Sequence, residues 1–276
     1  MKNIFIIGTA RGGSTLLHSM LGKSKEILTF PETHLWRKSL PLPPKLRYFY
    51  AIDKDKKGAA VTMLQSIHNQ CPTKPVEQHL SWPPRPKAWS RVLLGALNSC
   101  AQLHQKNGWL EKTPQHLHFA ELIRSVHSEA KFIGLVRNPK SHVAALYHAS
   151  VNHKHSFQQS TVEKALNRYM SDLEMLRELQ EKGIAHIAYY EDLVEQPEKT
   201  LKEICSYSGI EYSKEMLDFQ DTAKQVSTAS ETWKKRNVGE LKLVDLSNER
   251  LTKDEIARVE EAVSKIKNPI LSRYGY

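Results

Sequence analysis

Short apolar runs alternate with helical apolar stripes along this chain. Apolar runs bounded by turn residues predict strands at 4–7, 131–136 and 184–189, and residues 29–33 predict a second strand or the end of one. Between and after them, apolar residues at helical spacing predict helices over about 115–127, 160–182, 197–208 and 252–266. Because strands separated by helices form parallel sheets, the pattern predicts an α/β domain with a mainly parallel central sheet flanked by helices on both faces.

Residues 37–100 interrupt this alternation with proline-rich stretches. Pro41, Pro43 and Pro44 stand near the start of the segment, and residues 81–86 read SWPPRP. Prolines at this density predict short helices and loops. A chain of 276 residues suits one domain that buries a substantial core. We therefore expect a single domain over 1–276, in which 37–100 is a helical or irregular insertion.

The charge balance favours an anionic ligand. Lys and Arg number 40 against 30 Asp and Glu, a net charge of +10 with neutral histidine, which suits a nucleotide, a nucleic acid or an acidic surface. The basic residues are dispersed, apart from runs at 54–57 and 234–236. Proteins that bind nucleic acids in their grooves usually concentrate such residues on one face. We therefore expect a nucleotide ligand and no nucleic-acid partner.

Cysteine usage and the first residues bear on the compartment. Cys71, Cys100 and Cys205 are odd in number and widely spaced, so they indicate neither a disulfide framework nor a zinc site, and we expect a reducing compartment. The first apolar run ends at Gly8, well short of the roughly 7–15 apolar residues of a signal peptide or the roughly 20 of a membrane span. We expect a cytoplasmic protein without a membrane partner.

The segment after the first predicted strand has the composition of a phosphate-binding loop. Gly8 and Gly13 match the spacing of a Walker A loop, G-x-x-x-x-G-K-[ST], and helical apolar residues follow Ser14 and Thr15. Free N–H groups at such a helix start attract anions. Ser14, however, stands where a Walker lysine would reach the β/γ-phosphates, and the nearest cation is Arg11. The loop favours a phosphorylated nucleotide bound for a reaction other than phosphoryl transfer, although an ordinary glycine-rich turn has the same residues.

A second candidate anion site follows the predicted strand at 131–136. Arg137 comes directly after this strand and just before Pro139, which predicts a helix start. Open α/β sheets bind ligands at the carboxyl ends of their strands, and a guanidinium group there suits a phosphate. A structural salt bridge at the strand end is the alternative role for Arg137.

Several segments together resemble the sulfotransferases that use 3′-phosphoadenosine 5′-phosphosulfate (PAPS). Residues 10–16, ARGGSTL, resemble the family's 5′-phosphosulfate loop, P-[RK]-S-G-[ST]-[ST]-L, with alanine for proline and glycine for serine. Residues 137–139 resemble its strand-then-R-[DN]-P motif, residues 109–114 (WLEKTP) its G-E-K-T-P segment, and residues 190–197 its Y-E-D-L-x-x-x-P motif. A late basic loop, at residues 227–230 and 234–237, also resembles a nucleotide-binding loop of the family. Together these segments occur in the family's order from residue 4 to about 240.

The resemblance implies a P-loop-like sulfotransferase fold and a set of nucleotide contacts. The 3′-phosphate would lie on Arg137, and a family serine eight residues later is Ala145 here, so Ser141 on the same helical face is the expected substitute. The late basic loop is also compatible with ordinary solvated surface. Further contacts to PAPS, and to its product adenosine 3′,5′-bisphosphate (PAP), are expected from Arg11, Gly12, Gly13, Ser14, Thr15, Tyr190, Ser227, Lys235, Arg236 and Asn237.

The resemblance also implies in-line transfer of a sulfuryl group without a metal. A sulfonate carries one negative charge, fewer than a transferred phosphoryl group, so positively charged side chains can stabilise it. Arg11 and Lys112 would neutralise the sulfonate and the departing phosphate oxygen. Glu32, 21 residues after Arg11 as in the tyrosylprotein enzymes, is the expected general base, and partial burial would raise its pKa above the usual value of about 4.3. His34 is the competing base.

The acceptor has no sequence motif of its own. We expect its pocket to form largely from the insertion and from the loop at 148–157, with aromatic residues that either line the pocket or fill the insertion's own core: Trp36, Tyr48, Tyr50 and Trp82. A small molecule, such as a natural product sulfated on oxygen or nitrogen, is preferred over a protein tyrosine or a polysaccharide. The enzyme is expected to be a monomer or a homodimer.

Two other functional classes stay open. A P-loop kinase or NTPase would need ATP and Mg²⁺, and Ser14 in the lysine position argues against it. A non-catalytic polyanion-binding protein would fit the isoelectric point near 9.4. It would bind with a steep salt dependence and without preference for 3′-phosphorylated adenosine.

Overall fold

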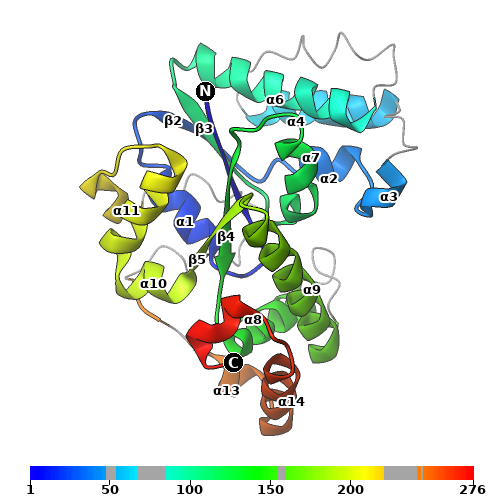
Figure 1. Ribbon diagram of the computed structural model, residues 1–276, viewed down its shortest axis with the longest axis vertical. Coiled ribbons are helices and arrows are strands. Elements are labelled where there is room, and N and C mark those ends of the chain that lie inside the picture. The colour runs from blue at the N-terminus through cyan, green and yellow to red at the C-terminus, as the bar shows by residue number, and fades with distance from the viewer. Residues whose placement is uncertain (48–53, 68–84, 154–159, 221–240, 244) are drawn as a thin grey trace.

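A five-stranded parallel sheet forms the centre of the molecule (Figure 1). The structure is a computed structural model of residues 1–276, and it describes all of them except 48–53, 68–84, 154–159, 221–240 and 244. The strands are β1 (Lys2–Ile7), β2 (Ile27–Phe30), β3 (Gly108–Lys112), β4 (Lys131–Val136) and β5 (Ala185–Tyr189), in the spatial order β2-β3-β1-β4-β5. The predicted mainly parallel sheet is therefore confirmed.

The register brings the carboxyl ends of all five strands to one edge of the sheet. Ile6 of β1 lies opposite Lys112 of β3, and Ile7 lies opposite Gly134 of β4. Phe30, the last residue of β2, pairs with Glu111, and Val136 and Tyr189 pair at the ends of β4 and β5. The residues that directly follow each strand therefore meet at this carboxyl edge.

Helices cover both faces of the sheet (Figure 1). The described helices are α1 (Ser14–Leu21), α2 (Leu35–Ser39), α3 (Pro44–Arg47), α4 (Lys54–Ile67), α6 (Pro86–Leu103), η1 (Pro114–Phe119), α7 (Ala120–Arg124), α8 (Pro139–Asn152), α9 (Val162–Glu181), α10 (Tyr190–Glu195), α11 (Pro197–Ser208), η2 (Lys214–Leu217), α13 (Ser247–Arg250), α14 (Lys253–Ser264) and η4 (Pro269–Tyr274). Alternate side chains of β1 point to opposite faces, so Ile4 and Ile6 pack with α1, α10 and α11, whereas Phe5 and Ile7 pack with α6 to α9 and α14.

The insertion is more regular than its proline content predicts. Within 37–100, the expectation of short helices is wrong for α6, which spans 18 residues. Pro86 lies at the first turn of α6, where the missing N–H would have no helical partner in any case. Trp89, Leu93 and Leu97 on this helix are fully buried in the core beside the sheet.

Two other elements differ from the sequence expectation. Strand β3 did not stand out as an apolar run because Glu111 and Lys112 occupy its end, yet all five of its residues are buried. The helix expected over 115–127 is instead the 3₁₀-helix η1 followed by the short α7. The N–H of His116 donates to the carbonyl of Thr113 at 2.9 Å, the tight i to i+3 bond of a 3₁₀ turn.

The state of the cysteines corrects the sequence analysis. Cys100, buried on α6, is disulfide-bonded, whereas Cys205 on α11 is a free and buried thiol. An odd number of cysteines excludes only the pairing of all of them, so the expected lack of a disulfide is wrong and the argument for a reducing compartment loses its basis. None of the helices in the described part of the chain is long and apolar enough to cross a bilayer.

The close contact of β1 and β3 at Gly108 predicts an unfavourable effect of Gly108→Ala. A methyl group there would lie 2.6 Å from the Lys2 Cβ and closer still to the Lys2 carbonyl oxygen, which belongs to the neighbouring backbone. We expect urea unfolding to show a loss of about 1–3 kcal/mol, the usual cost of overpacking.

A matched control for this substitution is Gly95→Ala in α6. No heavy atom outside the helix backbone lies within 4 Å of the added methyl group, and alanine stabilises a helix interior by roughly 0.5–1 kcal/mol relative to glycine. The two substitutions should therefore change the free energy of unfolding in opposite directions. Equal effects would contradict the close approach of β1 to Gly108.

Candidate functional site

The glycine-rich loop between β1 and α1 has a positive φ at three of its residues, two of which are glycines. Gly8 and Gly13 have φ values of 138° and 96°, and Arg11 between them is also left-handed at 72°. A Cβ atom at Gly13 would lie 2.8 Å from the Tyr190 Cε2, so the tyrosine ring packs directly on this glycine. The N–H of Gly8 donates to the Pro114 carbonyl at 3.2 Å, which ties the loop to the end of β3.

The loop leads into the N-terminus of α1. Gly13 is the N-cap, Ser14 and Thr15 begin the helix, and its first turn contains no acidic residue. The N–H groups and the helix dipole at this end favour a negatively charged group. As predicted from the sequence, Ser14 begins a helix; its role in nucleotide binding stays a prediction.

Tyr190 brings the loop and the second predicted anion site together. The ring that packs on Gly13 also lies under the Arg137 guanidinium, with 4.7 Å from the guanidinium carbon to the ring centre. Burial raises the pKa of the Tyr190 phenol, against the smaller opposing effect of Arg137, so the phenol stays neutral. Two cations from distant parts of the sequence, Arg11 and Arg137, therefore belong to the same carboxyl edge.

Partly buried hydrogen bonds hold the backbone around Arg137 in place. The Arg137 carbonyl accepts from the Tyr169 hydroxyl at 3.0 Å, and the Asn138 N–H donates to the Glu191 carboxylate at 2.9 Å. The Asn138 side chain accepts from the N–H groups of Lys140 and Ser141 and so caps α8. The sequence predicted the helix start at Pro139, and the cap explains why it forms there.

Ser141, the expected substitute for the family serine, has a protein partner. Its hydroxyl donates to the Asp245 carboxylate at 2.8 Å, and the Ser247 N–H donates to the same oxygen at 2.9 Å. Burial raises the pKa of Asp245, but these hydrogen bonds and the nearby Lys140 outweigh burial and hold it below its usual value. Ala145 is buried on the same helix. Ser141 therefore lies beside a carboxylate, and its contact with a 3′-phosphate stays a prediction.

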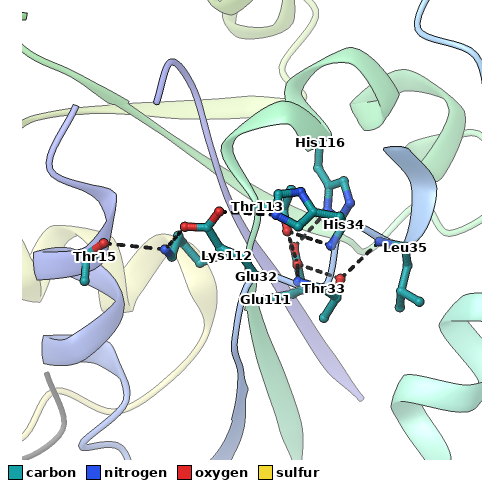
Figure 2. Close-up of polar contacts among 9 residues, drawn as sticks. All are labelled: Thr15, Glu32, Thr33, His34, Leu35, Glu111, Lys112, Thr113 and His116. Carbon is teal, nitrogen blue, oxygen red and sulfur yellow. Dashed lines mark hydrogen bonds and ion pairs between the residues drawn. The ribbon is translucent and has the colours of Figure 1, made fainter. Parts of the chain in front are cut away.

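Lys112 connects α1 to the segment that follows β2 (Figure 2). Its ammonium group forms an ion pair with the Glu32 carboxylate and lies 3.5 Å from the Thr15 hydroxyl. The lysine side chain is almost fully buried, whereas that of Glu32 is about one-quarter exposed. An ammonium group in contact with a carboxylate favours the ionised form of the acid, which is the form that accepts a proton.

His34 completes this group of side chains. Its Nε2 lies 3.5 Å from the second Glu32 oxygen, and its φ of 52° is left-handed. Burial is the main cause that lowers the pKa of His34, with the neighbouring Glu32 acting in the opposite direction. The structure thus brings the two candidate bases together at the carboxyl edge, with Glu32 in contact with Lys112 on one side and near His34 on the other.

A buried carboxylate that the sequence analysis did not single out lies behind these residues. Glu111 accepts from the Thr33 N–H at 3.1 Å, from the hydroxyls of Thr33 and Thr113, and from the His116 Nδ1 at 2.8 Å (Figure 2). Burial raises the pKa of Glu111, but His116 and the hydroxyl donors together outweigh burial and lower it. The signal in the sequence was a glutamate next to Lys112 at the end of an otherwise apolar strand.

Other predicted residues are not placed at the site. Ser227, Lys235, Arg236 and Asn237 lie outside the described residues, as do Tyr48, Tyr50 and Trp82. Trp36 is fully buried and donates through its indole N–H to the Ser90 hydroxyl at 3.1 Å, so it fills the core. Within the described ranges, no group of three or more His, Cys, Asp or Glu side chains has an arrangement that could hold a metal ion.

Comparison with known proteins identifies the fold and the family signature. A family model described as "Sulfotransferase family" matches residues 3–214. An uncharacterized protein of Aquifex aeolicus (strain VF5) is 23% identical over 240 residues. That match covers 83% of this chain and 28% of the relative, so the chain spans less than a third of the relative's length.

Solved structures with the same fold include three sulfotransferases. The sulfotransferase domain from the curacin biosynthetic pathway has a TM-score of 0.61 at 19% identity and covers 95% of this chain and 97% of its own. The domain from the Synechococcus PCC 7002 olefin synthase has a TM-score of 0.62 at 17% identity, with 96% and 94% covered. The mouse sulfotransferase SULT7A1, solved with PAP, has a TM-score of 0.53 at 13% identity, with 99% and 86% covered.

The contact between His142 and the loop predicts a pH-dependent stability. The His142 Nε2 lies 2.9 Å from the Ala10 carbonyl, which only accepts, so the neutral ring donates from Nε2. Burial lowers the pKa of His142 to about 3, with Arg137 and Arg11 contributing and the Ala10 carbonyl opposing. Between pH about 3 and about 6.5 the unfolded chain then binds more protons than the folded protein, so stability falls as the pH falls through this range.

The comparison that tests this effect is urea unfolding of the wild type and of His142→Gln from pH 7 to pH 4. The glutamine keeps a donor for Ala10 but does not titrate. We expect the wild type to lose stability relative to the variant by up to about 1.4 kcal/mol per pH unit below pH about 6.5. Parallel pH profiles would show that His142 is not held neutral.

Proposed function

The chain belongs to the sulfotransferase family, and from this premise we propose that it transfers a sulfuryl group from PAPS to a hydroxyl or amine of a small-molecule acceptor. The observation that carries the proposal is the packing of Tyr190 on both Gly13 and Arg137. This packing supports the proposal because it brings the start of α1 and a guanidinium group to the same edge of the sheet. A nucleotide with phosphates at both its 5′ and 3′ positions matches such a pair of sites.

The donor would be held at two ends. The backbone of the loop and the residues Gly12, Gly13, Ser14 and Thr15 bind the 5′-phosphosulfate, with the positive charge of Arg11 beside it. Arg137 binds the 3′-phosphate, and Tyr190 offers its ring face between the two sites. Ser141 reaches the 3′-phosphate once its hydroxyl leaves Asp245, and the late loop with Ser227, Lys235, Arg236 and Asn237 adds further contacts.

The transfer step requires one bond to form as another breaks. The acceptor oxygen or nitrogen attacks the sulfur in line with the bridging oxygen of the 5′-phosphosulfate. The bond between the sulfur and that oxygen breaks, its electron pair stays on the phosphate, and PAP leaves. Lys112, poised beside Thr15 at the start of α1, neutralises the charge that develops on the leaving oxygen.

Glu32 accepts the proton that the acceptor loses. Its position at the carboxyl edge, beside Lys112 and His34, supports this role. His34, 3.5 Å from Glu32, orients the carboxylate or substitutes for it as the base, and its lowered pKa keeps the ring neutral at physiological pH. The charge on the migrating group is then balanced by Arg11 and Lys112, and no step needs a metal.

The acceptor pocket is proposed to form partly from the insertion at 37–100 of a single domain. Helix α2, which begins directly after His34, and helix α4 pack on each other beside the proposed base. The two biosynthetic sulfotransferase domains that share the fold support a natural product as the acceptor.

Calorimetry with PAP, AMP and ATP tests the donor assignment, and ³⁵S-labelled PAPS with a panel of phenols, alcohols and amines tests the transfer. We expect PAP to bind more tightly than AMP, and the label to move to at least one acceptor in the presence of EDTA. ATP binding that needs Mg²⁺, without PAP binding, would instead indicate a kinase or NTPase. Binding of all polyanions alike would indicate a non-catalytic protein.

Arg137→Ala should remove the preference for a 3′-phosphate. Hydrogen bonds to a charged group contribute about 1.5–3 kcal/mol, so PAP should bind roughly 10- to 100-fold more weakly while AMP affinity changes little. Arg177→Ala is the matched control, because Arg177 forms its ion pairs with Glu174 and Glu181 on the exposed side of α9. A variant that still prefers PAP over AMP would exclude Arg137 from the 3′-phosphate site.

Glu32→Gln should slow transfer by about 10²- to 10⁴-fold, the usual contribution of a general base, while PAP affinity stays within about twofold. Glu129→Gln, an exposed glutamate just before β4 at the opposite edge of the sheet, is the control. The rates are measured with the acceptor found in the panel. If Glu32→Gln remains active and His34→Gln does not, the base is His34.

A further inference from the structure

The carboxylate of Glu111 is the most enclosed charged group near the proposed site. It is 0% exposed and accepts four hydrogen bonds from three residues, Thr33, Thr113 and His116. The ring of His116 in turn packs against Trp36 at 5.1 Å between ring centres. An ionised carboxylate in such apolar surroundings carries a large desolvation cost, and an apolar side chain could pack there without that cost.

The side-chain hydrogen bonds of Glu111 continue the connection between β2 and β3 beyond the point where their backbone pairing ends. In the part of the chain that the structure describes, strand β2 pairs only with β3, and their last backbone pair is Phe30 with Glu111. The next residue, Pro31, has no N–H to continue the ladder. From that point, the Glu111 side chain holds the end of β2 through the backbone and the hydroxyl of Thr33.

The two threonines that bond to Glu111 are sequence neighbours of the proposed site residues. Thr33 lies between Glu32 and His34, and Thr113 directly follows Lys112. Thr113 also accepts the N–H of His34 at 3.2 Å, which supports the left-handed backbone of that histidine. Such a backbone costs on the order of 1–2 kcal/mol in a residue other than glycine, and it persists only where its surroundings impose it.

We propose that Glu111 is a positioning residue, which acts through Thr33 and Thr113 to set the relative position of Glu32, His34 and Lys112. The proposal rests on the function proposed above. Because successive side chains of a strand point to opposite faces, Lys112 points toward α1 and Glu111 toward the other face of the sheet. The end of β3 therefore carries both the lysine proposed to act in the transfer and the carboxylate proposed to position Glu32 and His34. Loss of the Glu111 contacts should lower kcat far more than it weakens PAP binding.

The test uses Thr113→Val, because loss of the buried charge in Glu111→Gln could prevent folding. The valine removes the hydroxyl that joins Glu111 to His34 at nearly constant volume. We expect kcat for sulfuryl transfer to fall by about 10- to 100-fold, the effect of a misplacement of about 1 Å, while the Kd for PAP changes by less than about threefold. Thr113→Ser, which keeps the hydroxyl, should restore most of kcat.

Thr200→Val in α11 is the matched control. Thr200 is buried, and its hydroxyl donates one hydrogen bond shared between the Asp192 and Gln196 carbonyls, at 3.0 and 2.9 Å. The substitution therefore also removes a hydroxyl from its hydrogen-bond partners, but on the other face of the sheet. We expect a comparable loss in the free energy of unfolding with kcat within about twofold of the wild type. If kcat follows stability equally in Thr113→Val and Thr200→Val, Glu111 has only a structural role.

A readout without catalysis separates this proposal from the proposed function. NMR titration of the His34 ring should show that Thr113→Val, but not Thr200→Val, raises the pKa of His34 toward its ordinary value, because the freed ring becomes exposed to water. An unchanged His34 pKa would overturn the positioning role even in an active enzyme. If the wild type neither binds PAP nor transfers a sulfuryl group, but the His34 pKa still rises in Thr113→Val, the proposed function is wrong. The inference that Glu111 positions His34 through Thr113 would remain supported.

Discussion

The parallel pairing of β1 with β3 on one side and β4 on the other is the constraint on which the site depends. Because parallel strands run in one direction, the glycine loop, Lys112 and Arg137 all follow at the same edge although they are far apart in sequence. An antiparallel β3 would carry Lys112 to the opposite end of the sheet. The connections of a parallel sheet also need helices, which then bury both faces.

The packing of side chains at the carboxyl edge determines how close the proposed site residues lie to one another. Tyr190 fills the space above Gly13 and lies against Arg137, so the size of one glycine determines how near the loop and the guanidinium approach each other. Two residues further along, Thr15 in the first turn of α1 lies 3.5 Å from the ammonium group of Lys112, which also pairs with Glu32. The proposed donor and acceptor sides thus meet at the start of α1.

The two buried charges at the end of β3 both have partners that offset their burial. Lys112 and Glu111 are adjacent, nearly fully buried and opposite in sign, yet they face different sides of the sheet and have different partners. Each is placed where several hydrogen bonds offset the cost of leaving water. This arrangement lets one strand direct a positive charge toward the loop and a negative charge into the core on the opposite face.

The sequence alone determined the elements whose signals are local: the strand at 131–136, the helix start at Pro139, the long helix at α9 and the loop that ends at Ser14. It also placed Glu32, Lys112, Arg137 and Tyr190 among the site candidates, because each follows directly on a strand or lies in a motif. Only the tertiary structure decided that Tyr190 packs between Gly13 and Arg137, that Ser141 pairs with Asp245, and that Glu111 joins β2 to β3. These contacts join residues tens to more than a hundred positions apart, and their energies depend on burial and partners, which no local pattern encodes.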